Sequence, residues 1–168
     1  MGKASRDKVD ADELRALLKY DPQSGVFTWI KPPTFRRRSG NGAGSINQKG
    51  YRRIGIRRRY YAAHRLAWLY MTGEWPSLQV DHINNDRADN RWANLRLATN
   101  SQNKANSPKR ANTSSPLKGA FPRGGRWEAA ITFNNKRRYL GLYATPEEAH
   151  AVYCAEAIRL FGQFARAA

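Results

Sequence analysis

Apolar positions near the start of the chain recur at helical spacing. Leu14, Leu17 and Leu18 form one stripe within residues 10–20, and this spacing predicts a short helix. Asp10 stands in front of the stripe, where its carboxylate can accept a hydrogen bond from the backbone N–H groups that a helix start leaves free. We therefore expect the helix to begin just after this residue.

The next segments alternate between apolar and polar positions. This alternation predicts a strand over residues 25–30 and a hairpin over residues 50–65. Ile54 and Ile56 fall on one face of the hairpin, which therefore belongs in the core. The segment that follows places apolar residues at helical spacing and reaches Gly73, which predicts a helix that ends there.

A short polar region lies between two further strands. Residues 78–83 and residues 94–99 have strand patterns, and residues 84–90 between them are typical of a turn-forming loop. A helix follows the second strand, with Thr99 or Asn100 as its cap. The predicted order is strand, loop, strand, helix.

The rest of the chain predicts a second domain. Residues 107–116 are rich in Pro, Ser and Asn, as in linkers between domains. Residues 117–168 predict three antiparallel strands, the last two joined by a tight turn at residues 134–135. Thr145 then caps a helix that ends at Gly162.

Together these elements predict an α+β fold. The first domain, residues 9–106, is a basic, β-rich module that ends in a strand–strand–helix motif at about residues 79–106. The second, residues 117–168, is a three-stranded antiparallel sheet packed on one helix. Arg126 and Thr132 project from the middle strand to the face that the helix leaves free.

Composition limits the partners of the chain. Its 168 residues include 30 lysines and arginines against 13 aspartates and glutamates, so the net charge is +17. An excess this large favours polyanions, meaning nucleic acid or an anionic membrane surface. No apolar run approaches the roughly 20 residues that span a bilayer, and the N-terminus lacks the apolar core of a secretory signal. We therefore expect a cytoplasmic protein that binds nucleic acid and no membrane.

The basic residues concentrate in one segment. Residues 22–73 contain eleven lysines and arginines and no acidic residue. A solvated surface, the alternative explanation, normally mixes both signs because like charges repel, so this block with its interspersed aromatic residues favours phosphate contacts. The candidate DNA-binding residues here are Arg36, Arg37, Arg38, Arg52, Arg53, Arg57, Arg58 and Arg59.

Asp81 and His82 stand side by side in front of the polar loop. A carboxylate is a hard oxygen ligand, and an imidazole titrates near neutral pH and can take a proton from water. Adjacent residues on a strand point to opposite sides, so both can serve one site only where the strand ends. Asn103, on the following helix, can supply a neutral oxygen ligand. Such a donor set suits magnesium or manganese better than zinc.

Structural roles are the alternatives for these residues. The asparagines of the loop could serve a turn alone, and Asp81 could be a cap. His64 begins an apolar helix, so we interpret it as structural, with a phosphate contact as the alternative. Cys154 is interpreted as a packing residue, and His150 is given no role.

The stretch from residue 81 to residue 103 resembles the HNH nuclease family, which has the ββα-metal fold, in the variant whose last ligand is Asn. Asn94 stands 12 residues after His82, and Asn103 stands 21 residues after it. The resemblance implies that Asp81 and Asn103 hold one Mg²⁺ or Mn²⁺ per site and that His82 is the general base. It also implies that Asn94 braces the loop and orients the histidine. The resemblance extends from Tyr20 to about Ser107 and is to phage-type enzymes.

The last block resembles the APETALA-type DNA-binding domain. The similar stretches are "KGAFPRGGRWEAAI" and "RRYLGLYATPEEAHAVYCAEAIRLFG", which cover nearly the whole block. The resemblance implies that the sheet, not the helix, enters the major groove. The chain departs from the plant pattern at Phe121, Ala130 and Thr132, so the plant target sequence does not carry over. The implied contacts are Arg123, Arg126, Arg137 and Tyr139.

These observations predict a metal-dependent DNA endonuclease of the homing type that nicks one strand. Double-stranded DNA is the expected substrate. We expect a monomer with no obligate protein partner, because the chain lacks a long apolar heptad pattern and its charge opposes self-association. The alternative is a site-specific DNA-binding regulator that keeps the same scaffold without catalysis.

Overall fold

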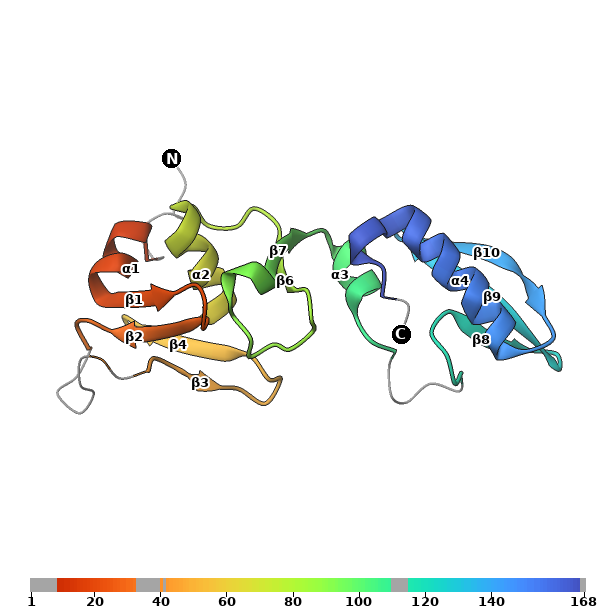
Figure 1. Cartoon of the computed structure of the whole chain (residues 1–168), viewed down its shortest axis with the longest axis horizontal. Coiled ribbons are helices and arrows are strands. Elements are labelled where there is room, and N and C mark those ends of the chain that lie inside the picture. The colour runs from red at the N-terminus through yellow and green to blue at the C-terminus, as the bar shows by residue number, and fades with distance from the viewer. Residues whose placement is uncertain (1–8, 33–39, 41, 110–114, 167–168) are drawn as a thin grey trace. The chain divides into compact units, whose positions relative to one another are not determined.

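The computed structural model describes residues 9–32, 40, 42–109 and 115–166 (Figure 1). The chain divides into two compact units, Met1–Leu97 and Ala98–Ala168, and each is described by itself. In the described part of the chain, no helix is long and apolar enough to cross a membrane.

The described residues of the first unit form three small sheets and two helices. Strands β1 and β2 form one sheet, β3, β4 and β5 form the second, and β6 and β7 form the third. The elements in chain order are α1 (Ala11–Leu17), β1 (Leu18–Asp21), β2 (Val26–Trp29), β3 (Ser45–Ile46), β4 (Arg52–Ile56), β5 (Arg59–Ala62), α2 (Ala63–Thr72), β6 (Gln79–His82), the 3-10 turn η1 (Trp92–Asn94) and β7 (Leu95–Ala98).

The first helix begins where it was expected and ends early. The Asp10 carboxylate accepts a hydrogen bond from the backbone N–H of Glu13 at 2.8 Å, as an N-cap does. The helix then stops at Leu17 instead of continuing to residue 20, so that part of the prediction was wrong. Leu18 and Tyr20 are both buried and alternate with exposed neighbours, and this period of two places them in a strand paired with β2.

The hairpin of β4 and β5 follows the predicted pattern except at its tip. Ile54 and Ile56 are buried in the core, as expected. Arg57 and Arg58, with φ angles of 47° and 61°, form the turn between the strands. Alternation along residues 53–57 predicts that Arg53 and Arg57 share the other strand face, but Arg57 lies in the turn, because turn residues with positive φ leave the pleat.

The core of this unit holds the polar loop between β6 and β7 in place. The Tyr20 hydroxyl, beside the Phe27 ring in the core, donates a hydrogen bond to the Asn90 carbonyl at 2.7 Å. Gly25 has a φ of 72°, and a side chain there would overlap the backbone of Asn90 and Arg91. The turn between β1 and β2 thus lies directly against the loop and fixes its position.

The second unit is a three-stranded sheet with helices against it. The strand order is β10-β9-β8, all antiparallel, as predicted. The turn between β9 and β10 consists of Asn134 and Asn135, with φ angles of 49° and 61°, as expected for a tight turn. The elements are α3 (Asn100–Asn106), β8 (Ala120–Arg123), β9 (Arg126–Phe133), β10 (Lys136–Tyr143), α4 (Pro146–Phe161) and the 3-10 turn η2 (Gly162–Phe164).

Helix α3 packs in the second unit, although the sequence analysis assigned it to the first domain. Its cap is Thr99, which forms a capping box with Gln102. Ala105 is buried in the same apolar cluster as Ile131 and Tyr153. The helix of the predicted strand–strand–helix motif therefore gains its burial from the sheet and helix that follow it in the chain.

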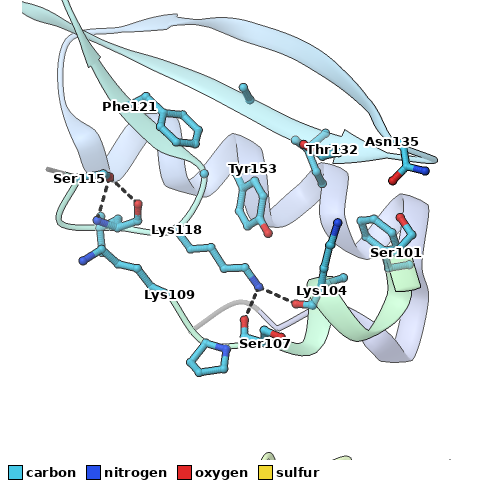
Figure 2. A pocket seen from close by; sticks show the side chains of 17 residues that line it. Ser101, Lys104, Ser107, Lys109, Ser115, Lys118, Phe121, Thr132, Asn135 and Tyr153 are labelled. Atoms are coloured by element: carbon cyan, nitrogen blue, oxygen red, sulfur yellow. Dashed lines mark hydrogen bonds between the residues drawn. The ribbon is translucent and has the colours of Figure 1, made fainter. Parts of the chain in front are cut away.

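Lys118 holds the end of α3. Its ammonium donates hydrogen bonds to the carbonyls of Ala105 at 2.6 Å and Ser107 at 2.7 Å, as Figure 2 shows. A helix leaves its last carbonyls without intrahelical partners, and Lys118 donates to two of the carbonyls at this end. Its positive charge also interacts favourably with the negative end of the helix dipole. The stem of Lys118 lies along a hollow of about 500 Å³ between α3 and the sheet.

Replacing Lys118 by Met should therefore loosen α3. The variant loses two hydrogen bonds to a charged group, each worth on the order of 1.5–3 kcal/mol. Hydrogen exchange read by mass spectrometry should show faster exchange of the α3 amides. The matched control is Lys104→Met, which removes the same charge from the exposed surface of the same helix. Equal exchange in the two variants would mean that Lys118 does not hold the helix.

Candidate active site

The candidate metal ligand and the candidate general base both lie at the end of strand β6, and a strand end is where we expected them. Strand β6 pairs with β7, and its last two residues are Asp81 and His82. Only 5% of Asp81 and 4% of His82 is exposed to solvent. A buried polar side chain must be hydrogen-bonded, so the partners of these two residues define the site.

Asp81 is paired with Arg96 on the neighbouring strand. The guanidinium Nε donates to Oδ2 of the carboxylate at 3.0 Å, and both side chains are largely buried. Removing one member of such a buried pair typically costs about 3–5 kcal/mol, because the other charge is left in the interior. Arg96 was not among the predicted site residues, because its only signal in the sequence is a basic residue within an otherwise apolar strand.

His82 contacts the side-chain amide of Asn90. Its Nε2 lies 3.3 Å from Oδ1 of Asn90, and the Nδ2 of the same amide donates to the Ala88 carbonyl at 2.8 Å. This second bond fixes the amide orientation, so Oδ1 faces the histidine and can only accept. The proton of a neutral imidazole therefore lies on Nε2, and Nδ1 is the basic nitrogen.

Burial lowers the pKa of His82, and the hydrogen bond to Asn90 opposes that shift. The direction favours the neutral imidazole, which is the form that can accept a proton. Asn90 is 1% exposed and was not among the predicted site residues. In the sequence it is one asparagine among several in a turn-rich loop, so only its position in the fold distinguishes it.

Asn94 braces the loop by three hydrogen bonds. Its Oδ1 accepts from the Asn84 backbone at 3.0 Å, and its Nδ2 donates to Oδ1 of Asn84 at 2.9 Å and to the Asp89 carbonyl at 2.8 Å. These bonds connect Asn84 and Asp89, near the two ends of the loop, to Asn94, which directly precedes β7. The bracing expected of Asn94 agrees with this geometry, and its orientation of His82 stays a prediction.

A second histidine lies against the first. The ring centroid of His64, at the start of α2, is 4.9 Å from that of His82, edge to face, and the Tyr51 ring is 5.3 Å from His64. Burial lowers the pKa of His64 to about 3, and the neighbouring His82 adds to the shift. His64 is therefore neutral at physiological pH. It is 9% exposed and packs the back of the site, in line with the structural interpretation.

Asn103 lies on α3, in the second unit. Its role as a ligand together with Asp81 stays a prediction. The donor chemistry of Asp81 and Asn103 fits a hard divalent cation, because a carboxylate keeps lone pairs beyond those used by Arg96 and an amide oxygen adds a neutral ligand. No group of three or more His, Cys, Asp or Glu suited to a metal occurs among the described residues.

The predicted DNA-binding arginines of the first unit differ in their surroundings. Arg36, Arg37 and Arg38 lie outside the described residues. Arg52 is half-buried and donates to the Gly44 carbonyl at 3.3 Å, so it supports the loop before β3.

The remaining arginines lie on the β4–β5 hairpin. Arg57 pairs with Glu13 at 2.6 Å. Arg53 lies over the Tyr60 ring, with its guanidinium carbon 5.0 Å from the ring centroid. Arg53, Arg58 and Arg59 are exposed.

The four predicted contacts of the second unit share one face of its sheet. The pairings Arg123 with Arg126, Arg137 with Thr132 and Tyr139 with Ala130 put their side chains on the same side. Helix α4 covers the other side, where Ala129 and Ile131 are buried. The structure therefore brings Arg123, Arg126, Arg137 and Tyr139 together on the open face. Glu128, which the sequence analysis did not consider, lies among them.

Comparison with known proteins matches the segment that carries this site. Residues 61–105 match the model of an HNH endonuclease family, HNH_3. An HNH endonuclease of Acanthamoeba polyphaga mimivirus, itself uncharacterised, is 35% identical over 105 residues, which are 61% of this chain and 54% of the relative. The chain thus spans about half the length of that relative.

Among solved structures, the chain is similar to the HNH homing endonuclease I-HmuI, in a structure that describes DNA binding and cleavage by that enzyme. The TM-score is 0.45 at 20% identity, and the alignment covers 88% of this chain and 81% of the other. The segment matched by the family model extends from β5 to α3 and includes Asp81, His82 and Asn94. The segment of this chain that is similar to HNH endonucleases is therefore the one that carries the candidate site.

Proposed function

We propose that this chain is a metal-dependent endonuclease of the homing type that hydrolyses phosphodiester bonds in double-stranded DNA and nicks one strand. The observation that carries the proposal is the buried Asp81–His82 pair at the end of β6, within the segment that matches HNH endonucleases. The net charge of +17 supports a polyanionic substrate. A phage origin and action in the cytoplasm of the host cell belong to the same proposal.

His82 is the proposed general base. Its neutral imidazole accepts a proton from the attacking water at Nδ1, while Asn90 holds Nε2 and so fixes the ring plane. Burial supports this role, since it lowers the pKa and keeps the base unprotonated at neutral pH. Asn94 keeps the loop in the conformation that presents Asn90 to the histidine.

Asp81 and Asn103 are the proposed ligands of one Mg²⁺ or Mn²⁺. HNH nucleases generally depend on a metal, and a bound divalent ion would stabilise the charge that develops on the phosphate and the leaving oxygen. Arg96 pairs with the Asp81 carboxylate and so orients it at the strand end. The two residues contribute oxygen donors only, which supports magnesium or manganese over zinc.

DNA contacts are proposed on both units. In the first, the exposed arginines of the β4–β5 hairpin supply phosphate contacts. In the second, which we propose is an APETALA-type domain, the open face of the sheet supplies contacts to the major groove. The chain would act as a monomer, because two different DNA-binding surfaces suit an extended, asymmetric target.

One observation favours a second candidate function, a DNA-binding regulator without catalysis. Asp81, the proposed metal ligand, already pairs with Arg96 at 3.0 Å, and a purely structural ion pair would look the same. A plasmid-nicking assay with and without magnesium separates the two functions. Magnesium-dependent nicking supports the endonuclease, and DNA binding without nicking supports the regulator.

Replacing His82 by Ala should slow cleavage by a factor on the order of 10² to 10⁴, as for the loss of a general base. DNA affinity should stay nearly intact, because the residue is buried and carries no charge at neutral pH. Single-turnover rates and fluorescence anisotropy measure the two quantities separately. Cleavage near the wild-type rate would remove His82 from the mechanism.

Replacing Asp81 by Ala should weaken Mn²⁺ binding, measured by calorimetry, and abolish most cleavage, because no oxygen donor remains. Because the same change removes the buried pair with Arg96, a thermal melt must show that the variant is still folded. Asn103→Asp should retain activity, since an oxygen donor survives, whereas Asn103→Ala should lose it. Wild-type activity that persists in EDTA is the contrary outcome.

A monomer with one such site should cut one strand of a duplex. The chain carries a single Asp-His pair of this kind, and one site attacks one phosphodiester bond at a time. Denaturing gels with each strand labelled in turn should therefore show early cleavage of one strand only. Equal early cleavage of both strands, together with a dimeric mass in solution, would contradict the prediction.

A further inference from the structure

The open face of the sheet in the second unit carries one carboxylate among its basic residues. Glu128 lies in the middle strand β9, opposite Phe121 of β8 and Leu142 of β10. Only 10% of its side chain is exposed. A surface that meets phosphates gains nothing from a negative charge, so the presence of this carboxylate requires an explanation.

Two arginines reach Glu128 from the two neighbouring strands. Arg123, on β8, donates from Nη1 to Oε2 at 2.6 Å, and Arg137, on β10, donates from Nη2 to Oε1 at 2.8 Å. Each oxygen of the carboxylate thus holds one guanidinium. Arg137 also lies over the Phe121 ring, with its guanidinium carbon 4.7 Å from the ring centroid. The hydrogen bond from Arg123, and after it that from Arg137, lower the pKa of Glu128, which therefore stays charged.

The outer parts of both arginines remain accessible. Their side chains are 67% and 57% exposed, although the carboxylate that holds them is almost covered. A guanidinium has five N–H donors in a rigid plane, and each pair to Glu128 is made through a single nitrogen. The remaining donors can reach a ligand, because more than half of each side chain is exposed. Arg126, which faces the same side of the sheet, forms no ion pair within the described part of the chain.

Fixing an arginine changes what it can recognise. A free guanidinium on a flexible stem turns readily toward the nearest phosphate, which gives affinity without sequence preference. A guanidinium held in one plane loses less freedom on binding and presents two parallel donors, the arrangement that matches the O6 and N7 atoms of guanine in the major groove. The Glu128 carboxylate that holds the guanidinium also repels phosphates, which disfavours a phosphate contact by the same arginine.

We propose that Glu128 is a positioning residue that determines sequence specificity, because it holds Arg123 and Arg137 in the plane required to contact base edges of DNA. The proposal rests on the proposed DNA-binding function of the second unit and adds to it the residue that converts two phosphate-binding side chains into base-reading ones. Glu128 acts through the two arginines that its oxygens hold, since only 10% of its own side chain is exposed.

Glu128→Gln tests the proposal in the full-length chain. Wild-type protein first selects its preferred duplex from a random pool, and fluorescence anisotropy then gives the affinity of each variant for that duplex and for a shuffled one. The variant removes one negative charge, so affinity for the shuffled duplex should stay the same or rise. The preference for the selected duplex should fall about ten-fold, the size of one lost bidentate contact. A residue with a merely structural role would lower both affinities together.

The matched control is Glu156→Gln. Glu156 pairs with Arg159 on α4, on the opposite side of the sheet, and carries the same charge. This variant should change both affinities equally and leave the preference intact. If Glu128→Gln keeps the wild-type preference, or if Glu156→Gln loses as much of it, the proposal is wrong.

A second pair of variants covers the case in which Glu128→Gln does not fold, as judged by its thermal melt. Arg123→Lys and Arg137→Lys keep the charge and lose the planar fork, so each should reduce the preference without reducing affinity for the shuffled duplex. Wild-type protein that nicks DNA but prefers no sequence would overturn this inference and leave the proposed nuclease intact. Wild-type protein that binds neither duplex would overturn the DNA-binding function itself.

Discussion

Among the described residues of this chain, a carboxylate is buried only where arginine holds it. The two buried acidic side chains of the described residues are Asp81 and Glu128, one in each unit, and each accepts hydrogen bonds from guanidinium groups on neighbouring strands. Burying an unpaired carboxylate would cost several kcal/mol, on the order of the whole stability of a small domain. The excess of basic residues makes such pairing easy, and both candidate sites are built around it.

The polar loop between β6 and β7 is held in its conformation mainly by hydrogen bonds of its polar side chains. Residues 84–90 of this loop offer no large apolar side chain to the core, so side-chain amides and carboxylates replace the missing contacts. Asn84, Asp89 and Asn94 bond one another and the loop backbone, while Tyr20 and Gly25 connect the loop to the core. The abundance of asparagine is thus the means by which a turn-rich segment becomes rigid enough to hold an imidazole.

Local patterns predicted much of the fold. The caps Asp10, Thr99 and Thr145, the β4–β5 hairpin and the meander of the second unit all follow from short-range signals. The first helix was predicted too long because Leu18 satisfies helical spacing and strand alternation equally well, and only its pairing with Trp29 decides between them.

In the candidate site, the sequence patterns predicted Asp81 and His82 but not the residues that these two side chains contact. Arg96, Asn90 and Glu128 matter through contacts across strands and loops, and no spacing along one segment reveals such contacts. The packing of α3 was missed for the same reason, since its one alanine, Ala105, looks like that of any short polar helix.

The attachment of α3 to the second unit limits how the chain can be recombined. Nuclease and DNA-binding modules are often treated as exchangeable parts joined by a linker. Here α3 is buried and capped by residues that follow the linker of residues 107–116 in the chain, among them Ile131, Tyr153 and Lys118. A chimera that grafts a foreign DNA-binding domain after residue 106 would leave this helix without its supports. The unit that can be inherited or engineered as a whole therefore begins at Ala98.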